Sequence, residues 1–366
     1  MLFCDEMRIL HVITSLQTGG AEHLLVDLLP LLRDEGRNVV ELLVFNGEQT
    51  PFMDVLKGKG ITVHQLLMSK NVYNPLNIFR LIRFVGNYDI IHTHNTACQL
   101  FAPIATLLSC DSKTLVTTEH SSNNRRRTMK WFKPIDSWMY SRYAAVVCIA
   151  DQPRKNLEDY LGKRNNICTI LNGVNVSRFL RPVKDISHQS GFVVTMVAGL
   201  RIEKDHETVL RAMRNLPENY SLRLVGDGVK KDELNALTKE LGLESRVDFL
   251  GMRLDVPEIL EQSDVVVLSS HWEGLSLSSI EGMASGRPFV ASDVDGLREM
   301  VGGAGVLFTH GDDKELAEKI HWLCEHPDEY QKVATRCQEK AKQYDISVMA
   351  QKYLDLYKDL MGTQDN

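Results

Sequence analysis

The chain has 366 residues, of which 43% are hydrophobic and 25% are charged, and its formal net charge is −6. One hydrophobic core stops growing at roughly 250–300 residues, so this length predicts two domains. The composition excludes fibrous and intrinsically disordered classes, and the acidic balance excludes a whole-protein attraction to nucleic acid.

The cysteines and the N-terminus indicate a cytoplasmic protein. The seven cysteines are scattered without metal-binding or redox spacing, which disfavours a disulfide framework and a structural zinc site. Asp5 and Glu6 stand where a signal peptide would carry positive charge. We interpret residues 1–6 as an extension before the first strand. No run of 18 apolar residues is present, so no membrane span is expected.

Short runs rich in Val and Ile alternate with helical patterns in the first half of the chain. The predicted strands are 9–14, 39–45, 61–66, 90–94, 114–118, 145–149 and 167–170. The predicted helices include 22–35 and 75–85. Alternation of this kind is typical of βαβ units, so we expect a parallel sheet covered on both faces.

The second half repeats this alternation and ends in helices. Its predicted strands are 192–198, 221–225, 247–250, 265–268, 289–291 and 304–308, and its predicted helices include 207–215, 230–241 and 279–285. A helical tail follows at 312–324, 328–343 and 347–361. The polar segment 172–191 shows no periodicity and is expected to link the two domains.

Loops at the carboxyl ends of parallel strands are where ligands bind in such sheets. The loop at 18–22 pairs glycines with a helix start, which suits a phosphate, although a tight turn is the alternative. His120 ends the strand at 114–118 and is either functional or structural. Arg201 and Lys204 leave the first strand of the second domain and could hold a diphosphate, or could be ordinary exposed charges.

The stretch HWEGLSLSSIEGMASGRP places Glu273 and Glu281 eight residues apart. Glu273 is expected on a loop and Glu281 about one turn into a helix, where backbone amides can bind a phosphate. A carboxylate there can accept hydrogen bonds from two vicinal hydroxyl groups of a ribose. The alternative is a carboxylate that only offsets the helix dipole.

Together these motifs resemble the retaining GT-B glycosyltransferases of family 4, the bacterial glycosyl transferases group 1. The resemblance covers nearly the whole chain. It includes the loops at 19–22, 120, 171–175, 201–204, 225–228 and 247–251, and the E-x7-E stretch followed by Gly286-Arg287-Pro288, Gly296 and Glu299.

This resemblance implies two doubly wound Rossmann-like domains facing a central cleft, with a helical C-terminal tail that returns to the first domain. The first, acceptor-side domain would span 1–183 together with 345–366. The second would span 184–344 and bind the nucleotide sugar.

The resemblance also implies roles for individual residues. Glu281 would bind the ribose, Glu273 the donor sugar, and Arg201 and Lys204 the diphosphate, while His120 would face the donor sugar at the reaction centre. The remaining donor-binding residues would be Gly20, Gly226, Gly274, Leu275, Ser276, Leu277 and Ser278. Many relatives carry the diphosphate arginine at the position of Gly199 here, so Arg201 is expected to take over its role.

The implied reaction is retaining transfer of a hexosyl unit from a nucleotide diphosphate sugar, most simply a UDP-sugar. Cations and helix amides would stabilise the leaving diphosphate, so neither a metal nor a cofactor is expected. Asp293 and Asp295 form the Asp-x-Asp pattern of another glycosyltransferase class. Because that class has one such domain rather than two, we expect a turn or a sugar-facing loop there.

The acceptor is expected to be a glycan or a lipid-linked sugar of bacterial surface polysaccharide synthesis. A basic and aromatic segment could dock on lipid at the cytoplasmic face of the membrane, or could be a solvated basic loop. Its residues are Arg125, Arg126, Arg127, Lys130 and Trp131. Two further functional hypotheses are a sugar-nucleotide epimerase of the same architecture and a catalytically silent subunit that binds sugar nucleotides.

Overall fold

The computed structural model describes residues 6–17, 20–33, 36–66, 71–109, 113–120, 127, 129–187 and 190–362, without the side chain of Lys130. The chain forms two compact units, Met1–Gly173 with Ile346–Asn366 and Val174–Asp345. The sequence reading had instead placed the first boundary at 183/184. Among the described residues, no helix combines the length and the apolar character that crossing a membrane requires.

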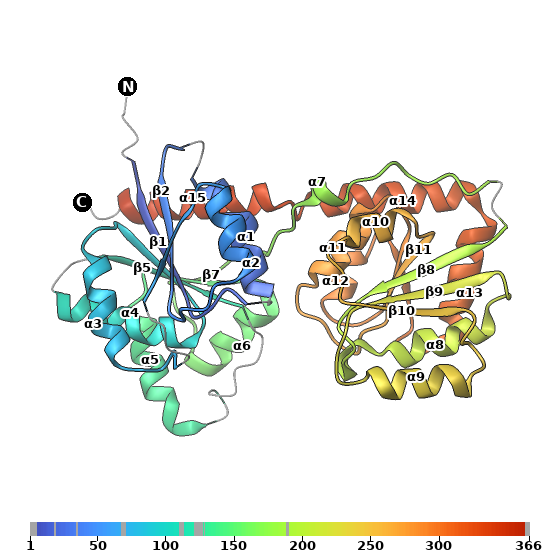
Figure 1. Ribbon diagram of the computed structural model, residues 1–366, viewed down its shortest axis with the longest axis horizontal. Coiled ribbons are helices and arrows are strands. Elements are labelled where there is room, and N and C mark those ends of the chain that lie inside the picture. Colours follow the sequence, from blue (N-terminus) through green and yellow to red (C-terminus); the bar gives the residue numbers. More distant parts are fainter. Residues whose placement is uncertain are drawn as a thin grey trace. The chain divides into compact units, whose positions relative to one another are not determined.

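The first unit contains a seven-stranded parallel sheet in the order β3-β2-β1-β4-β5-β6-β7 (Figure 1). Its strands are β1 (Arg8–Ile13), β2 (Val39–Val44), β3 (Thr62–Gln65), β4 (Ile90–His94), β5 (Thr114–Glu119), β6 (Ala145–Cys148) and β7 (Ile167–Thr169). Each predicted strand of this half is present, and its ends lie within one residue of the predicted ones. β-branched residues suit these strands because both faces of the sheet are covered.

Helices cover both faces of the first sheet. They are α1 (Gly20–Leu32), α2 (Pro51–Gly58), α3 (Leu76–Val85), α4 (Thr96–Ser109), α5 (Lys133–Ser141), α6 (Asp151–Leu161) and α15 (Ile346–Gly362), with the short 3₁₀ helix η3 (Lys130–Phe132) before α5. Alternate residues of β1 enter two different cores. Ile9 and Ile13 pack in the core that includes α1 and α15, whereas Leu10 and Val12 pack in the core that includes α3 and α4.

The last helix, α15, belongs to the first unit, as predicted for the C-terminal tail. Met349, Tyr353, Leu354 and Tyr357 lie on one face of α15 and are buried in the core that α1 shares. Their spacing of three and four residues is the apolar stripe of an amphipathic helix. The helix is therefore held by the hydrophobic burial of this stripe.

The second unit contains a six-stranded parallel sheet in the order β10-β9-β8-β11-β12-β13. Its strands are β8 (Phe192–Val197), β9 (Tyr220–Val225), β10 (Val247–Gly251), β11 (Val265–Leu268), β12 (Phe289–Ser292) and β13 (Val306–Phe308). Its helices are α7 (Val176–Phe179), α8 (His206–Asn215), α9 (Lys231–Glu240), α10 (Val256–Glu261), α11 (Leu277–Ala284), α12 (Leu297–Val301), α13 (Asp313–Glu325) and α14 (Pro327–Lys342), with the 3₁₀ helix η4 (Ile202–Lys204).

The predicted linker, 172–191, contains the crossing between the two units at 173/174, but its residues from Val174 onward belong to the second unit. Val176, Phe179 and Ile186 are buried in the core of this unit. Their irregular spacing has neither a helical nor a strand period, so the sequence pattern gives no sign of their burial. The chain passes between the units only at 173/174 and 345/346.

Candidate active site

The strand order of the second unit reverses between β8 and β11, which are neighbours in the sheet. Chain connections leave in opposite directions on either side of this point, so a crevice opens beyond the carboxyl ends of the two strands. The loop after β8 carries Arg201 and Lys204, and the loop after β11 carries Glu273. The fold therefore brings together residues that lie about seventy positions apart in the sequence.

Lys204 and Glu273 form an ion pair, with 2.5 Å between the Lys204 Nζ and the Glu273 Oε1. Ser270 donates its hydroxyl proton to the same carboxylate oxygen at 2.7 Å. The side chains are 19% and 9% exposed, so water screens the pair only weakly. Sequence reasoning gave these two residues separate ligand contacts and did not predict that they bind each other.

Hydrogen bonds to backbone carbonyl oxygens hold the two loops of this ion pair together. Ser269 donates to the carbonyl oxygens of Lys204 and Asp205 at 3.1 and 2.7 Å. The backbone amide of His271 donates to the carbonyl oxygen of Glu203 at 2.9 Å. The loops are therefore positioned independently of the ion pair itself.

Arg201 is 68% exposed at its side chain and lies 3.9 Å from Glu203. Its Nε lies 3.5 Å from where a Cβ would stand on Gly199. The side chain of Arg201 thus passes close to Gly199.

Gly226 and Gly228 permit a close approach between the loops after β9 and β8. A Cβ on Gly226, which has φ +141°, would lie 2.1 Å from the carbonyl oxygen of Ala198. A Cβ on Gly228 would lie 2.3 Å from the carbonyl oxygen of Leu200. Both distances are too short for any side chain at these positions. In this structure Gly226 therefore allows the backbone of the Arg201 loop to pass close by.

The N-terminus of α11 follows the Glu273 loop directly. Gly274, Leu275 and the N-cap Ser276 lead into a helix that begins with Leu277 and Ser278. The first backbone amides of a helix lack partners within it and carry partial positive charge, so this end can bind an anion. The backbone of Gly296 packs against Glu273, since a Cβ there would lie 2.5 Å from the Glu273 carbonyl oxygen.

Glu281 lies in the second turn of α11 and is half-buried. Burial raises the pKa of this carboxyl group from 4.5 to about 7, and the positive charge of Arg178 opposes the rise only partly. The helix-dipole explanation of this residue is therefore incomplete, because a carboxylate that served only the dipole would gain from staying ionised. The carboxyl group of Glu281 is thus shielded from water, and none of the described residues donates a hydrogen bond to it.

Asp293 and Asp295 both pair with Arg298. The Arg298 Nε donates to Asp293 at 2.6 Å and its Nη1 donates to Asp295 at 3.1 Å. The two carboxylates thus form an exposed ion-pair cluster at the start of α12.

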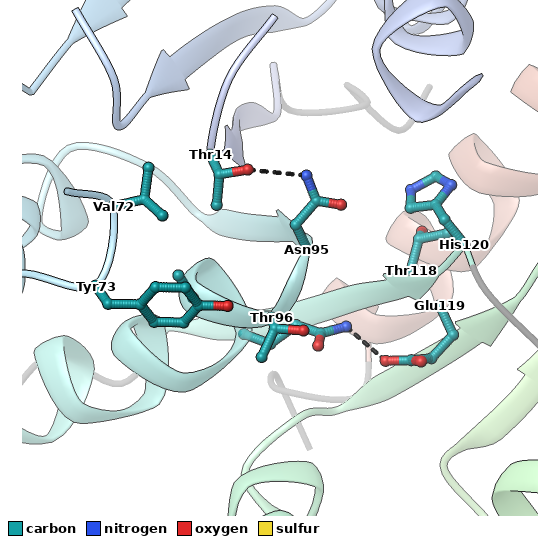
Figure 2. A pocket seen from close by; sticks show the side chains of 10 residues that line it. Thr14, Val72, Tyr73, Asn95, Thr96, Thr118, Glu119 and His120 are labelled. Atoms are coloured by element: carbon teal, nitrogen blue, oxygen red, sulfur yellow. Dashed lines mark hydrogen bonds between the residues drawn. The ribbon is translucent and has the colours of Figure 1, made fainter. Parts of the chain in front are cut away.

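The first unit has its own point of strand-order reversal, between β1 and β4. A cavity of about 230 Å³ opens there, lined by the ends of β1, β4 and β5 (Figure 2). Asn95 has φ 70°, a strained value for a residue other than glycine, and donates to Thr14 at 3.1 Å. Figure 2 shows Tyr73 on one side of this cavity and Glu119 with His120 on the other.

Glu119 is buried in the wall of this cavity and is fully engaged. Gln99 donates to its Oε1 at 2.6 Å and the hydroxyl group of Tyr140 donates to the same oxygen at 2.5 Å. Arg127 donates to its Oε2 at 2.6 Å. The Arg127 side chain is only 10% exposed. The expectation that Arg127 lies on an exposed lipid-docking surface was therefore wrong, because its guanidinium is paired with the buried Glu119.

His120 also lines the cavity, and its Nε2 lies 2.9 Å from the Nδ1 of His94. Burial lowers the pKa of His120 to about 4, so the ring is neutral near pH 7. His94, Asn95 and Thr14 were not singled out from the sequence. A usable signal existed: His92 and His94 alternate along a strand that was predicted to be buried on both faces.

The other residues of the first unit that were predicted to bind ligands either do not line this cavity or lie outside the residues that the structure describes. Gly20 is the first residue of α1, and a Cβ there would contact nothing within 4 Å. Trp131 is 65% exposed and stacks on Phe132 with 3.8 Å between ring centroids. Arg125, Arg126 and the side chain of Lys130 lie outside the described residues.

The raised pKa of Glu281 predicts how stability depends on pH. Between about pH 4.5 and 7 the folded state keeps a proton that the unfolded state has released, so stability falls as the pH rises through this window. Glu281→Gln removes this penalty. We expect the ligand-free variant to be more stable than the parent by about 1–3 kcal/mol at pH 8 and by little at pH 4.5, measured by urea unfolding. The exposed substitution Glu240→Gln is the control, and equal stabilisation of both variants at pH 8 would contradict the assignment.

Comparison with known proteins identifies the family. The family described as Glycosyltransferase Family 4 matches residues 18–178, and Glycosyl transferases group 1 matches residues 181–344. The chain is 29% identical over 320 residues to the putative glycosyltransferase EpsD of Bacillus subtilis, covering 80% of this chain and 83% of that one.

Two further similarities agree. The UDP-Gal:alpha-D-GlcNAc-diphosphoundecaprenol alpha-1,3-galactosyltransferase of Escherichia coli is 23% identical over 313 residues, covering 80% and 81% of the two chains. The structure of Anabaena Alr3699/HepE in complex with UDP superimposes with a TM-score of 0.82 at 24% identity, covering 96% of this chain and 100% of that one. The chain therefore belongs to glycosyltransferase family 4, has the GT-B fold, and is an enzyme of the hexosyltransferase class.

Proposed function

We propose that this glycosyltransferase transfers a hexosyl unit from a UDP-sugar, with retention of anomeric configuration, to a glycan or lipid-linked acceptor in bacterial surface polysaccharide synthesis. The observation that carries the proposal is the Lys204–Glu273 pair at the strand-order reversal of the second unit, beside the N-terminus of α11. A UDP donor is supported by the E. coli relative, which is named for UDP-Gal, and by the UDP bound to the Anabaena structure.

Donor binding would redistribute the charges of this site. The diphosphate would bind Lys204, Arg201 and the free amides of α11, since an anion is stabilised by both cations and a helix N-terminus. Glu273, no longer paired with Lys204, would then accept hydrogen bonds from hydroxyl groups of the sugar. Glu281 would accept hydrogen bonds from the two ribose hydroxyls, which replace the water that its burial removes.

The chemistry would rely on electrostatic stabilisation of the leaving diphosphate. Charge grows on the diphosphate as the glycosidic bond breaks, and Arg201 with Lys204 would lie where that charge develops. The acceptor hydroxyl would attack from the face of the leaving group and give its proton to the diphosphate, which retains the anomeric configuration. These cations would replace a metal ion in the reaction, and no cofactor takes part.

A panel of UDP-, GDP- and ADP-sugars with acceptor extract tests this function. We expect UDP release only when acceptor is present, and a product with the anomeric configuration of the donor by NMR. Glu281→Gln should weaken donor binding about tenfold or more, the loss of roughly one hydrogen bond to a charged group. Donor converted to an epimer without acceptor would instead indicate an epimerase. Donor binding without any turnover would indicate a silent subunit, and no nucleotide release with any donor would contradict the transferase proposal.

The position of Arg201 close to Gly199 predicts a rescue experiment. Arg201→Ala should weaken UDP binding by roughly 10- to 100-fold, because a charge-assisted hydrogen bond to the diphosphate is lost. The double substitution Gly199→Arg with Arg201→Ala places the guanidinium where relatives carry it and should restore most of the affinity. Isothermal titration with UDP measures both effects. Arg211→Ala, on the exposed face of α8, is the control. Unchanged UDP affinity in Arg201→Ala would contradict the diphosphate role.

A lipid-linked acceptor implies contact with a membrane surface. Trp131, with the adjoining Ile135 and Trp138, exposes apolar surface of the first unit. Arg125 and Arg126 precede Trp131 in the sequence and would add attraction to anionic lipid. Arg127 does not contribute, since it is paired with Glu119.

Vesicle sedimentation tests this contact. Each cation near an anionic surface contributes about 1 kcal/mol, so Arg125→Ser with Arg126→Ser should reduce binding to phosphatidylglycerol vesicles by roughly tenfold or more. Trp131→Ser should reduce it further through loss of apolar burial. Trp322→Ser, which alters an exposed tryptophan of the second unit, is the matched control. Unchanged sedimentation of the Arg125/Arg126 variant would contradict the proposal.

A further inference from the structure

Two imidazole rings and a carboxylate meet at the edge of the second sheet where its strands end. Asp205 lies at the start of α8, after the loop that leaves β8, while His271 follows β11 and His310 follows β13. The Nδ1 of His271 lies 2.6 Å from the Nε2 of His310 and 3.8 Å from the Oδ2 of Asp205. One nitrogen or oxygen of each residue lies within 4.8 Å of the other two. The three side chains are therefore close enough to bind one metal ion together.

The carboxylate of Asp205 is buried beside a group that carries no fixed positive charge. Its side chain is 6% exposed, and its one ion pair among the described residues is with His271, which is charged only if protonated. Thr208 donates to Asp205 through its backbone amide at 3.3 Å and its hydroxyl group at 2.6 Å, so Asp205 caps α8. Each carboxylate oxygen has two lone pairs, so both can accept further contacts. A cation beside this carboxylate would offset the cost of its burial.

Hydrogen bonds hold the three loops in place without a metal ion. The contacts of Ser269 described above join the loops after β8 and β11. Ser292, at the end of β12, donates its hydroxyl proton to the carbonyl oxygen of Ser270 at 2.7 Å. The backbone amide of Asp293 donates to the carbonyl oxygen of Phe308, at the end of β13, at 2.7 Å. The three side chains thus project from adjoining strand ends, and a ligand set on such a framework needs little ordering when an ion binds.

Only small movements separate this arrangement from a tetrahedral zinc site. Bonds of about 2.0–2.2 Å to Zn²⁺ separate neighbouring ligand atoms by roughly 3.3–3.5 Å. The two ring nitrogens, at 2.6 Å, would move apart by about 0.7–0.9 Å, and the Asp205 oxygen would approach His271 by about 0.3–0.5 Å. The rings of His271 and His310 cross at 81°, and His310 is exposed, so its ring is free to turn. The alternative is a simple hydrogen bond between the two rings.

A second group, His11, His92 and His94, is equally close together but is less suited to a metal ion. These three rings are at most 1% exposed. The two nitrogens of His92 bind the hydroxyl groups of Tyr357 at 2.6 Å and Thr118 at 2.8 Å, and His11 binds His94 at 3.0 Å. An ion could enter only by breaking these buried hydrogen bonds. The cluster of the second unit is instead reached from water, since the His271 side chain is 33% exposed.

We propose that Asp205, His271 and His310 form a binding site for one divalent transition-metal ion, best fitted by Zn²⁺, which fastens the loops after β8, β11 and β13 to one another. Two imidazoles and one carboxylate are donors that suit zinc, whereas Mg²⁺ and Ca²⁺ prefer oxygen ligands alone. A water molecule would complete the tetrahedron. None of the three residues is assigned to the donor or the acceptor, so the ion stabilises the second unit and takes no part in transfer.

Calorimetric titration of the chelator-treated enzyme with zinc chloride tests the site. We expect one ion to bind per chain and the midpoint of thermal unfolding to rise with the zinc concentration, because the ion binds the folded state. Magnesium chloride should have neither effect. Absence of zinc binding, or equal stabilisation by magnesium, would overturn the proposal. The titration uses no donor or acceptor, so its result is separate from any result on transfer.

Two substitutions distinguish metal binding from the other roles of these residues. Asparagine caps helices as well as aspartate does and tolerates the left-handed backbone at 205, where φ is 48°. Asp205→Asn should therefore unfold at nearly the parental temperature without metal, but should bind zinc roughly tenfold or more weakly. His310→Ala should weaken zinc binding by roughly 100-fold or more, since even partners outside the ligand shell contribute about 10–100-fold.

His326→Ala is the matched control, because it removes another exposed histidine of the second unit. We expect this variant to bind zinc with the affinity of the parent. Parental affinity in both Asp205→Asn and His310→Ala would place the ion elsewhere and would overturn the proposal.

Discussion

Parallel strand pairing is the constraint on which both halves of this enzyme depend. All strands of a sheet end at the same edge of that sheet. The strand order reverses at one point in each sheet, between β1 and β4 in the first unit and between β8 and β11 in the second. Loops distant in sequence must meet at these two points. Lys204 therefore reaches Glu273, and His94 reaches His120, without any contact specific to the reaction.

In the ligand-free second unit, the charged side chains of Lys204 and Glu273 neutralise each other. Lys204 and Glu273 satisfy each other, whereas Glu281 carries a desolvation penalty that no described partner relieves. A donor with one diphosphate and several hydroxyl groups matches both conditions. It supplies an anion for the lysine and hydrogen-bond donors for the two carboxylates, so binding exchanges internal contacts for ligand contacts and leaves few buried groups unpaired.

The sequence was sufficient for the strands, because Val- and Ile-rich runs bounded by polar residues allow few other structures. It was also sufficient to place Lys204 and Glu273 on loops after strands, and Glu281 in the helix that follows the Glu273 loop. The sequence could not show which side chains contact each other, because contacts between distant residues depend on the order of the strands in the sheet. Arg127 looked exposed beside two other arginines, but a buried Glu119 neutralises it. The His11–His94 contact joins residues eighty-three positions apart, and no periodicity reports such a contact.

The return of α15 has a consequence for how the molecule is made. The first unit is built from both ends of the chain, and the whole of the second unit, 174–345, lies between them. On a ribosome adding ~5–20 residues per second, roughly 9–35 s separate the emergence of β7 from that of α15. During this interval the sheet face that bears His92 lacks Tyr353 and Tyr357 as its cover. The first unit thus completes its folding only after the second has been synthesised, and a message truncated near its end would leave the earlier half of the protein unfinished.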